Sequence, residues 1–155
     1  MDASETTRWC RLLRAIHLCH RSIRGKLSVV IAQHNLNENQ FLLLEVCDQL
    51  ATAELDQRAL SREIGQSPSL TSQVVESLRQ RGLVQLDRSS HDRRRQIVDL
   101  SDQGRLLYTA VTQQTECLAE ELFEDHSCDE VESLIKTLEH LAQRCDTPNS
   151  RGKVA

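Results

Sequence analysis

The stretch from Gly82 to Ser101 constrains the fold more than any other part of this 155-residue chain. Apolar and polar residues alternate over Val84–Asp87 and again over Ile97–Leu100, and this period of two is typical of half-buried strands. The residues between the two runs, Ser89–Arg95, are polar and end in three adjacent arginines. We therefore predict a β-hairpin with one apolar face and a basic tip in solvent.

A helix is predicted directly before this hairpin, over residues 68–81. Ser67 suits the N-cap, Pro68 suits the first helical position, and Gly82 suits the residue after the helix. The inner face is predicted to hold Leu70, Val74, Val75 and Leu78. The outer face is predicted to hold Ser69, Ser72, Gln73, Glu76 and Gln80. A helix followed at once by an arginine-tipped hairpin is the layout of a winged helix-turn-helix, which contacts DNA through both parts.

Apolar residues at steps of three and four predict five further helices. They cover residues 7–34, Glu38–Leu50, a segment capped by Asp56 that ends at Gly65, a segment from Ser101 to about Asp125, and a segment opened by a Ser127–Glu130 capping box that runs to Cys145. The expected fold class is therefore mainly α with a small β-hairpin wing. We expect one domain over residues 1–147 and a disordered tail over residues 148–155.

The net charge of −4 argues weakly against a nucleic-acid partner, but the charges are unevenly distributed. Residues 56–100 contain eight arginines against six acids, whereas residues 116–139 contain nine acids against one lysine. Because salt screens exposed charges beyond about 10 Å, a local basic patch is enough to attract phosphates. The apolar runs are too short to span a bilayer and no leader pattern opens the chain, so we expect a cytoplasmic protein without a membrane partner.

The sequence gives little support for an enzyme or a metal protein. It contains no Gly-rich phosphate loop, no nucleophile elbow and no paired carboxylates in a recognisable context. His17 and His20 are one turn apart, and His126 lies near Cys128, but neither pair approaches a four-ligand set. We expect no catalytic residues, no metal and no cofactor. A winged-helix protein-interaction module without DNA binding remains an alternative.

The six cysteines raise another alternative, a cysteine-based redox-sensing regulator. Cys19, Cys117 and Cys145 fall on apolar stripes, where burial raises the pKa of a thiol and slows its attack. Cys10 and Cys128 are then the thiols expected to react readily. No activating base lies near either of them in the sequence, so we expect the cysteines to have a structural role rather than a redox role.

Several segments, in order and at the right spacing, resemble the MarR family of bacterial transcriptional regulators. Residues 36–41 resemble the start of the family's second helix, and residues 67–72 with residues 78–84 resemble its recognition helix and the turn into the wing. His91–Arg94 and Val98–Arg105 resemble the wing signature and the segment that follows it. The resemblance runs from about residue 36 to residue 105, and the flanking predicted helices fit the family in length and number.

The resemblance implies a homodimeric regulator, commonly a repressor, that binds a pseudo-palindromic operator in double-stranded DNA. Residues 7–34 and 102–146 would then be dimerisation helices, residues 36–101 the winged helix-turn-helix, and a small aromatic effector would bind between these parts. Many relatives carry arginines where this chain has Gln73 and Ser77. Bidentate arginine-to-guanine readout is therefore less available here, and Gln73 is a candidate for reading adenine.

In the family, an Asp of the wing orients an Arg that enters the minor groove. The matching residues here are Asp92, with Arg93 and Arg94 as the candidate arginines. The complete set of predicted DNA-binding residues is Ser67, Ser69, Ser72, Gln73, Arg79, Arg88, Asp92, Arg93, Arg94 and Arg95.

Overall fold

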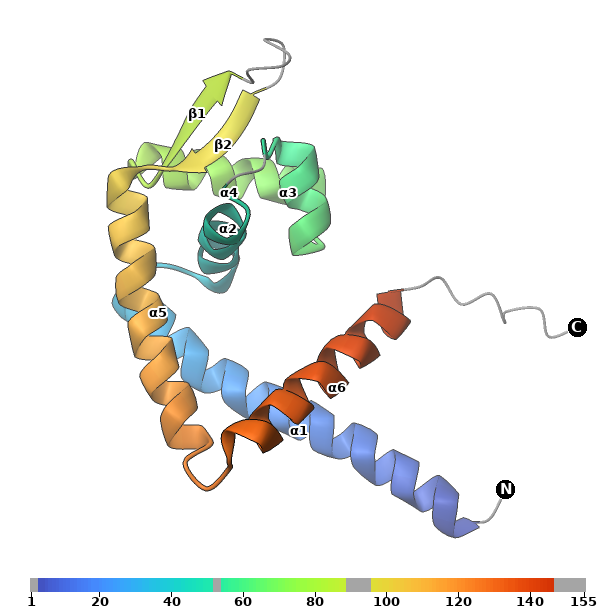
Figure 1. Cartoon of the computed structure of the whole chain (residues 1–155). Coiled ribbons are helices and arrows are strands. Elements are labelled where there is room, and N and C mark those ends of the chain that lie inside the picture. Colours follow the sequence, from blue (N-terminus) through green and yellow to red (C-terminus); the bar gives the residue numbers. More distant parts are fainter. Residues whose placement is uncertain (1–2, 52–53, 89–95, 147–155) are drawn as a thin grey trace, which may run out of the picture. The chain divides into compact units, whose positions relative to one another are not determined.

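The computed structural model describes residues 3–51, 54–88 and 96–146, which divide into two compact units, Met1–Thr115 and Glu116–Ala155. The elements of the first unit are α1 (Ala3–Gln33), α2 (Glu38–Gln49), α3 (Gln57–Ile64), α4 (Pro68–Gln80), β1 (Val84–Arg88), β2 (Gln96–Leu100) and most of α5 (Asp102–Leu122) (Figure 1). The second unit contains the end of α5 and α6 (Cys128–Asp146). The predicted class, mainly α with a β-hairpin, is confirmed. The predicted disordered tail lies outside the described residues.

Side-chain caps determine where α2 and α3 begin. Asn37 Oδ1 accepts the N–H of Gln40 at 2.9 Å, and Gln40 Oε1 accepts the N–H of Asn37 at 3.0 Å, which makes a reciprocal capping box. Asp56 caps α3 by accepting the N–H of Ala59 at 2.8 Å, as predicted. Gly65 ends α3 in the left-handed conformation, with a φ of 68°.

Two helices differ from their predicted bounds. α1 begins at Ala3 rather than residue 7, and it ends at Gln33 because Asn35 adopts a left-handed φ of 55°. α5 ends at Leu122 rather than near Asp125, where the chain enters a turn. Within the part of the chain that the structure describes, no helix is both long enough and apolar enough to cross a membrane.

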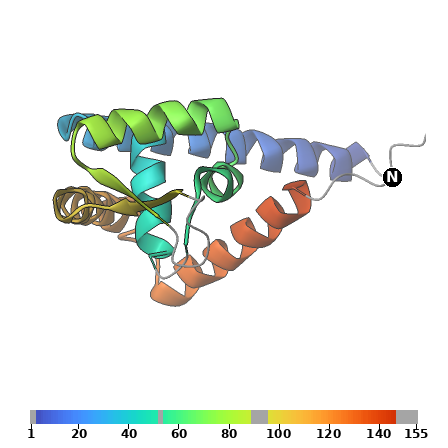
Figure 2. The same cartoon turned by 90° about the horizontal axis from the view of Figure 1, so that it is seen from above.

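β1 and β2 form the predicted antiparallel hairpin, with Val84 opposite Leu100 and Leu86 opposite Val98. Three of these side chains are buried and Leu86 is half-buried, so the predicted apolar face is confirmed. The view from above shows the hairpin leaving the C-terminal end of α4 (Figure 2). Because the connection is short, the position of the hairpin depends on the position of α4.

A contact that the sequence analysis did not anticipate ties the hairpin to the residues before α3. The N–H of Val98 donates to the carbonyl oxygen of Leu55 at 2.8 Å, and Asp56 forms an isolated antiparallel bridge with Ile97. The base of the wing therefore has backbone partners on a segment more than forty residues earlier in the chain, and its position is coupled to the start of α3.

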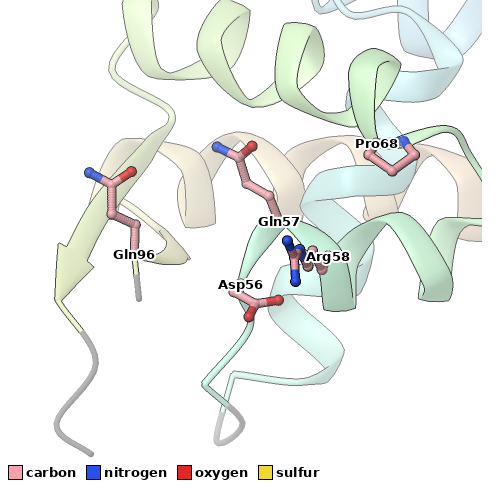
Figure 3. Close-up of a pocket in the computed structure, with 5 residues that line it drawn as sticks. All are labelled: Asp56, Gln57, Arg58, Pro68 and Gln96. Carbon is pink, nitrogen blue, oxygen red and sulfur yellow. The ribbon is translucent and has the colours of Figure 1, made fainter. Parts of the chain in front are cut away.

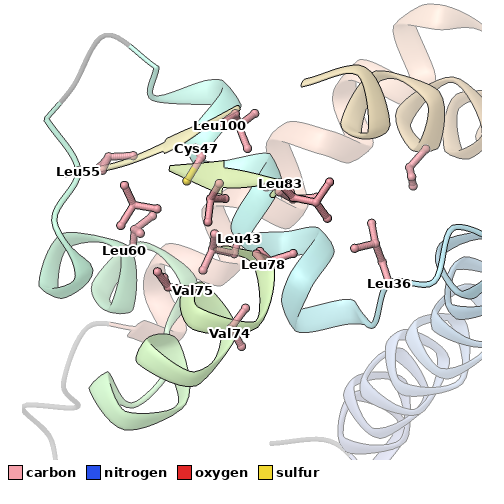
Figure 4. Packing of buried hydrophobic residues seen from close by; sticks show 14 of the residues in the cluster. Leu36, Leu43, Cys47, Leu55, Leu60, Val74, Val75, Leu78, Leu83 and Leu100 are labelled. Carbon is pink, nitrogen blue, oxygen red and sulfur yellow. The ribbon is translucent and has the colours of Figure 1, made fainter. Parts of the chain in front are cut away.

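A leucine-rich core supports the helices and the hairpin (Figure 4). Leu43 and Leu44 of α2, Leu60 of α3 and Leu78 of α4 are completely buried. The other buried apolar residues are Ile31, Leu36, Cys47, Leu55, Val74, Val75, Leu83, Val84, Val98, Leu100 and Val111. Since members of this cluster come from α2, α3, α4 and both strands, the core fixes α4 relative to the wing.

The hairpin joins α5 through a tight junction at Ser101. Its hydroxyl donates to the carbonyl oxygen of Gly82 at 2.6 Å and accepts the N–H of Gly104 at 3.0 Å. Gly104 packs so closely on Leu83 that an added Cβ would overlap the carbonyl oxygen of that residue. The junction therefore requires a residue without a side chain at position 104.

In the second unit, α6 begins with the predicted capping box. Glu130 Oε2 accepts the N–H of Ser127 at 2.9 Å, and this hydrogen bond lowers the pKa of the Glu130 carboxyl from its usual range. The exposed apolar side chains of α6, between 39% and 46% accessible, are Leu134, Ile135, Leu138 and Leu141. These four side chains form an apolar stripe along α6.

Candidate nucleic-acid interface

The first two turns of α4 present a polar surface. Ser67 caps the helix by accepting the N–H of Leu70 at 3.3 Å, and Pro68 occupies the first helical position, as predicted. The exposed polar side chains of these turns are Ser69, Ser72 and Gln73. All three face away from the core, as the pattern predicted.

The inner face of α4 differs from the prediction at one position. Leu70 was expected in the core but is 36% exposed, whereas Thr71 is completely buried. Thr71 can be buried because its hydroxyl donates to the carbonyl oxygen of Ser67 at 3.2 Å. Hydrophobic periodicity does not count threonine as a core residue, although its hydroxyl can be hydrogen-bonded within the helix. The pattern therefore assigned Leu70 rather than Thr71 to the inner face at the start of α4.

A buried hydrogen bond orients α4 on α2. Gln40 is 8% exposed, and its Nε2 donates to the hydroxyl of Ser77 at 3.0 Å while its Oε1 is held by the N–H of Asn37. A buried amide left without a partner costs about 1–3 kcal/mol, so this bond favours one rotation of α4 about its axis. Ser77 is engaged within the fold, and of the two positions where relatives carry arginine, Gln73 is the exposed one.

Arg79, a predicted DNA-binding residue, forms an ion pair within α4. Its Nε and Nη2 donate to the two carboxylate oxygens of Glu76 at 2.8 and 2.9 Å, and Gln80 donates to the same carboxylate at 2.9 Å. These hydrogen bonds lower the pKa of the Glu76 carboxyl to about 2. The side chain of Arg79 is 49% exposed, so it is accessible to a phosphate, but the neighbouring negative charge offsets part of that attraction.

The tip of the predicted wing lies outside the described residues. It contains Asp92, Arg93, Arg94 and Arg95, whose DNA contacts therefore stay predictions. Arg88 is the last residue of β1, is exposed, and lies opposite Gln96 at the start of β2. Of the predicted wing residues, Arg88 is therefore the one that the structure describes.

A hollow of about 570 Å³ lies beside the starts of α3 and α4 and the first residue of β2 (Figure 3). It is lined by Asp56, Gln57, Arg58, Pro68 and Gln96. Arg58 is exposed and forms no ion pair with any other residue in the described ranges. Arg58 was not among the predicted site residues, because helical spacing in α3 points to its apolar positions and a cation in the first turn is only a weak signal.

The winged segment matches a known protein family. Residues 34–95 match the model described as the MarR family. The match covers α2, α3, α4 and β1, and it is a likeness of this part of the chain to the family. The resemblance predicted from residues 36–105 is thereby confirmed, and no curated protein gives a significant match to the chain in sequence.

Solved structures show that the MarR-type fold extends over most of the chain. The transcriptional regulator BldR from Sulfolobus solfataricus superposes with a TM-score of 0.75 at 22% identity, covering 93% of this chain and 99% of that one. CouR from Rhodococcus jostii RHA1, bound to p-coumaroyl-CoA, gives 0.74 at 20% identity over 91% and 93% of the two chains. The transcriptional repressor CouR bound to a 23-mer DNA duplex gives 0.73 at 23% identity over 83% and 89%.

The cysteines of this MarR-type fold are placed differently from the prediction. Cys47 on α2 is the buried thiol, and burial raises its pKa to about 12. Cys19, Cys117 and Cys145, which were expected to be shielded, are exposed. Among the described residues, no three His, Cys, Asp or Glu side chains gather in a way that could hold a metal ion.

An apolar cavity of about 460 Å³ lies between α1 and α2. Most of its lining consists of the apolar side chains Ile23, Leu27, Ile31, Phe41 and Leu42. Arg24 and Glu38 also line it and form an ion pair of 2.6 Å that joins the two helices. The pair lowers the pKa of the Glu38 carboxyl and raises that of the Arg24 guanidinium.

Proposed function

We propose that this chain is a sequence-specific regulator of transcription, acting as a repressor in the cytoplasm rather than as an enzyme, and that double-stranded DNA is its partner. The observation that carries the proposal is the polar, exposed start of α4, held on a rigid core directly before the hairpin. The first residues of a recognition helix are those that contact base edges in the major groove. The family match supports this function, and the fold is similar to that of CouR bound to a DNA duplex.

Each predicted site residue has a proposed role. Ser67, Ser69, Ser72 and Gln73 approach the major groove from α4, and Gln73 is the candidate for reading adenine. Arg79 and Arg88 contact phosphates, as do Arg93 and Arg95 of the wing. Asp92 orients Arg94, which enters the minor groove. Arg58 is added to this set, because it is exposed and lines the hollow next to the start of α4.

We also propose a homodimer formed through residues 7–34 and 102–146. Among the described residues, α6 leaves four large apolar side chains exposed and α1 leaves six, which are Trp9, Leu12, Leu13, Ile16, Leu18 and Val29. Exposed apolar patches of this kind mark protein interfaces. Two recognition helices related by a two-fold axis reach major grooves about 34 Å apart, so the operator would be pseudo-palindromic.

Sedimentation equilibrium of the purified protein at micromolar concentration should give twice the chain mass of 17.7 kDa. Leu138→Gln should shift the equilibrium towards monomer, because it places an amide in an apolar interface. Lys136→Gln, on the opposite side of α6, introduces the same side chain and should leave the dimer intact. A wild-type monomer at this concentration would contradict the dimer.

The function is tested by selecting bound duplexes from a random pool with the wild-type protein. On the selected duplex, Arg94→Ala should weaken binding by about 1–3 kcal/mol, because an arginine in the minor groove is lost. The same substitution should leave the thermal melting of the protein unchanged, and Gln49→Ala at the exposed end of α2 should change neither quantity. If no duplex is enriched, the protein is better described as a winged-helix interaction module. If Arg94→Ala lowers the melting temperature as well as the affinity, Arg94 has a structural role.

The cavity between α1 and α2 supports a further part of the proposal, a small aromatic effector. Its apolar lining includes Phe41, whose ring stacks near that of Tyr108 with centroids 5.9 Å apart. Apolar cavities with a few polar groups at the edge are typical ligand sites. CouR, which has a similar fold, was solved bound to p-coumaroyl-CoA, and this ligand contains an aromatic acyl group.

A further inference from the structure

Leu70 is an apolar side chain in a position where the surface is otherwise polar. Among the described residues from 36 to 100, it is the only large hydrophobic side chain that is exposed. Its neighbours on the outer surface of α4 are Ser69 and Gln73, both exposed. The large apolar side chains exposed elsewhere in the described residues lie on α1, α5 and α6, so Leu70 is on a different element from those of the proposed dimer surface.

The position of Leu70 is fixed by its backbone. Its N–H donates to the N-cap hydroxyl of Ser67, and the next residue, Thr71, is anchored in the core with its hydroxyl on the carbonyl oxygen of Ser67. The first turn of α4 therefore cannot rotate to bury Leu70 without exposing Thr71. A leucine side chain on a rigid first turn is a preformed apolar contact surface.

We propose that Leu70 is a specificity-determining residue that packs against the 5-methyl group of a thymine in the major groove. This inference rests on the proposed function, since it requires that α4 enters the groove. Thymine is the base that presents a methyl group there, and apolar side chains are the groups that recognise it. Serine and glutamine beside Leu70 supply hydrogen bonds to neighbouring bases, while the leucine excludes water from the methyl group.

The inference is tested on the duplex selected with the wild-type protein. Each thymine is replaced in turn by deoxyuridine, which removes the methyl group and keeps base pairing. Burying one methyl group corresponds to about four-fold in affinity. At one thymine position per half-site, the wild type should therefore bind the deoxyuridine duplex about four-fold more weakly than the thymine duplex. Leu70→Ala should bind the thymine and deoxyuridine duplexes equally at that position.

Gln49→Ala is the control, because Gln49 is exposed at the end of α2 and lies outside both α4 and the proposed dimerisation helices. This variant should discriminate between thymine and deoxyuridine as the wild type does. Far-ultraviolet circular dichroism checks that both variants keep the helical fold.

Two outcomes overturn the inference while the proposed function stands: a selected duplex in which no deoxyuridine weakens wild-type binding, or a Leu70→Ala protein that still discriminates. Failure to enrich any duplex overturns the proposed function, and this inference with it. The two failures are therefore distinguishable in one series of measurements.

Discussion

Replacing Leu78 by alanine is expected to lower the free energy of unfolding by about 2–5 kcal/mol. Leu78 is completely buried where α4 packs against Leu43 of α2 and the start of the hairpin (Figure 4). The substitution removes apolar contacts and leaves a cavity that the surrounding helices cannot fully close. Urea denaturation at a fixed protein concentration measures the change, with the concentration held constant because a dimer couples association to stability.

Leu70→Ala is the matched control for this prediction, since it makes the same chemical change on the same helix. Leu70 is 36% exposed, so less apolar area leaves water on folding and the loss should be clearly smaller. Equal losses at the two positions would show that the buried face of α4 is assigned incorrectly.

Gly104→Ala is expected to lower the free energy of unfolding by about 1–3 kcal/mol, although alanine is the better helix former. The added Cβ would overlap the carbonyl oxygen of Leu83 and lie 3.0 Å from its carbonyl carbon. Both neighbours are backbone atoms, so relief requires α5 to move away from the wing and strains the Ser101 junction. Thermal or urea unfolding measures the loss.

Gly25→Ala provides the contrast, because Gly25 lies inside α1 and an added Cβ meets nothing within 4 Å. This substitution should raise stability by roughly 0.5–1 kcal/mol through helix propensity alone. The same chemical change is thus expected to have opposite signs at the two glycines. Stabilisation at both positions would disprove the close packing of α5 on Leu83.

Local patterns were sufficient to predict most of the secondary structure. The alternation around Val84 and Val98 predicted the strands and their shared apolar face, because side chains in a strand alternate between two sides. Asp56 and Ser67 marked helix starts, because a short polar side chain can satisfy a free N–H of the first turn. These interactions join residues three apart, so they can be recognised without knowledge of the fold.

The candidate site was predictable in part for the same reason. The polar residues of α4 were assigned to the outer face from helical spacing, and their exposure follows from the buried residues opposite them. Arg58 was missed because its place beside α4 depends on how α3 packs. The pairing of Arg79 with Glu76 joins residues three apart and was available from spacing, but spacing does not say which partner an arginine takes.

The sequence by itself determined the order of elements, the helix caps, the apolar face of the hairpin and the likeness of the winged segment to the MarR family, because each depends on residues close together in the chain. Only the tertiary structure decided that Thr71 is buried while Leu70 is exposed, that Gln40 holds Ser77, and that the wing pairs with Leu55. In each case the outcome depends on a hydrogen-bond partner or a packing surface rather than on hydrophobicity alone. A residue's own polarity limits where it can lie, but the groups around it in the folded chain decide which of those places it takes.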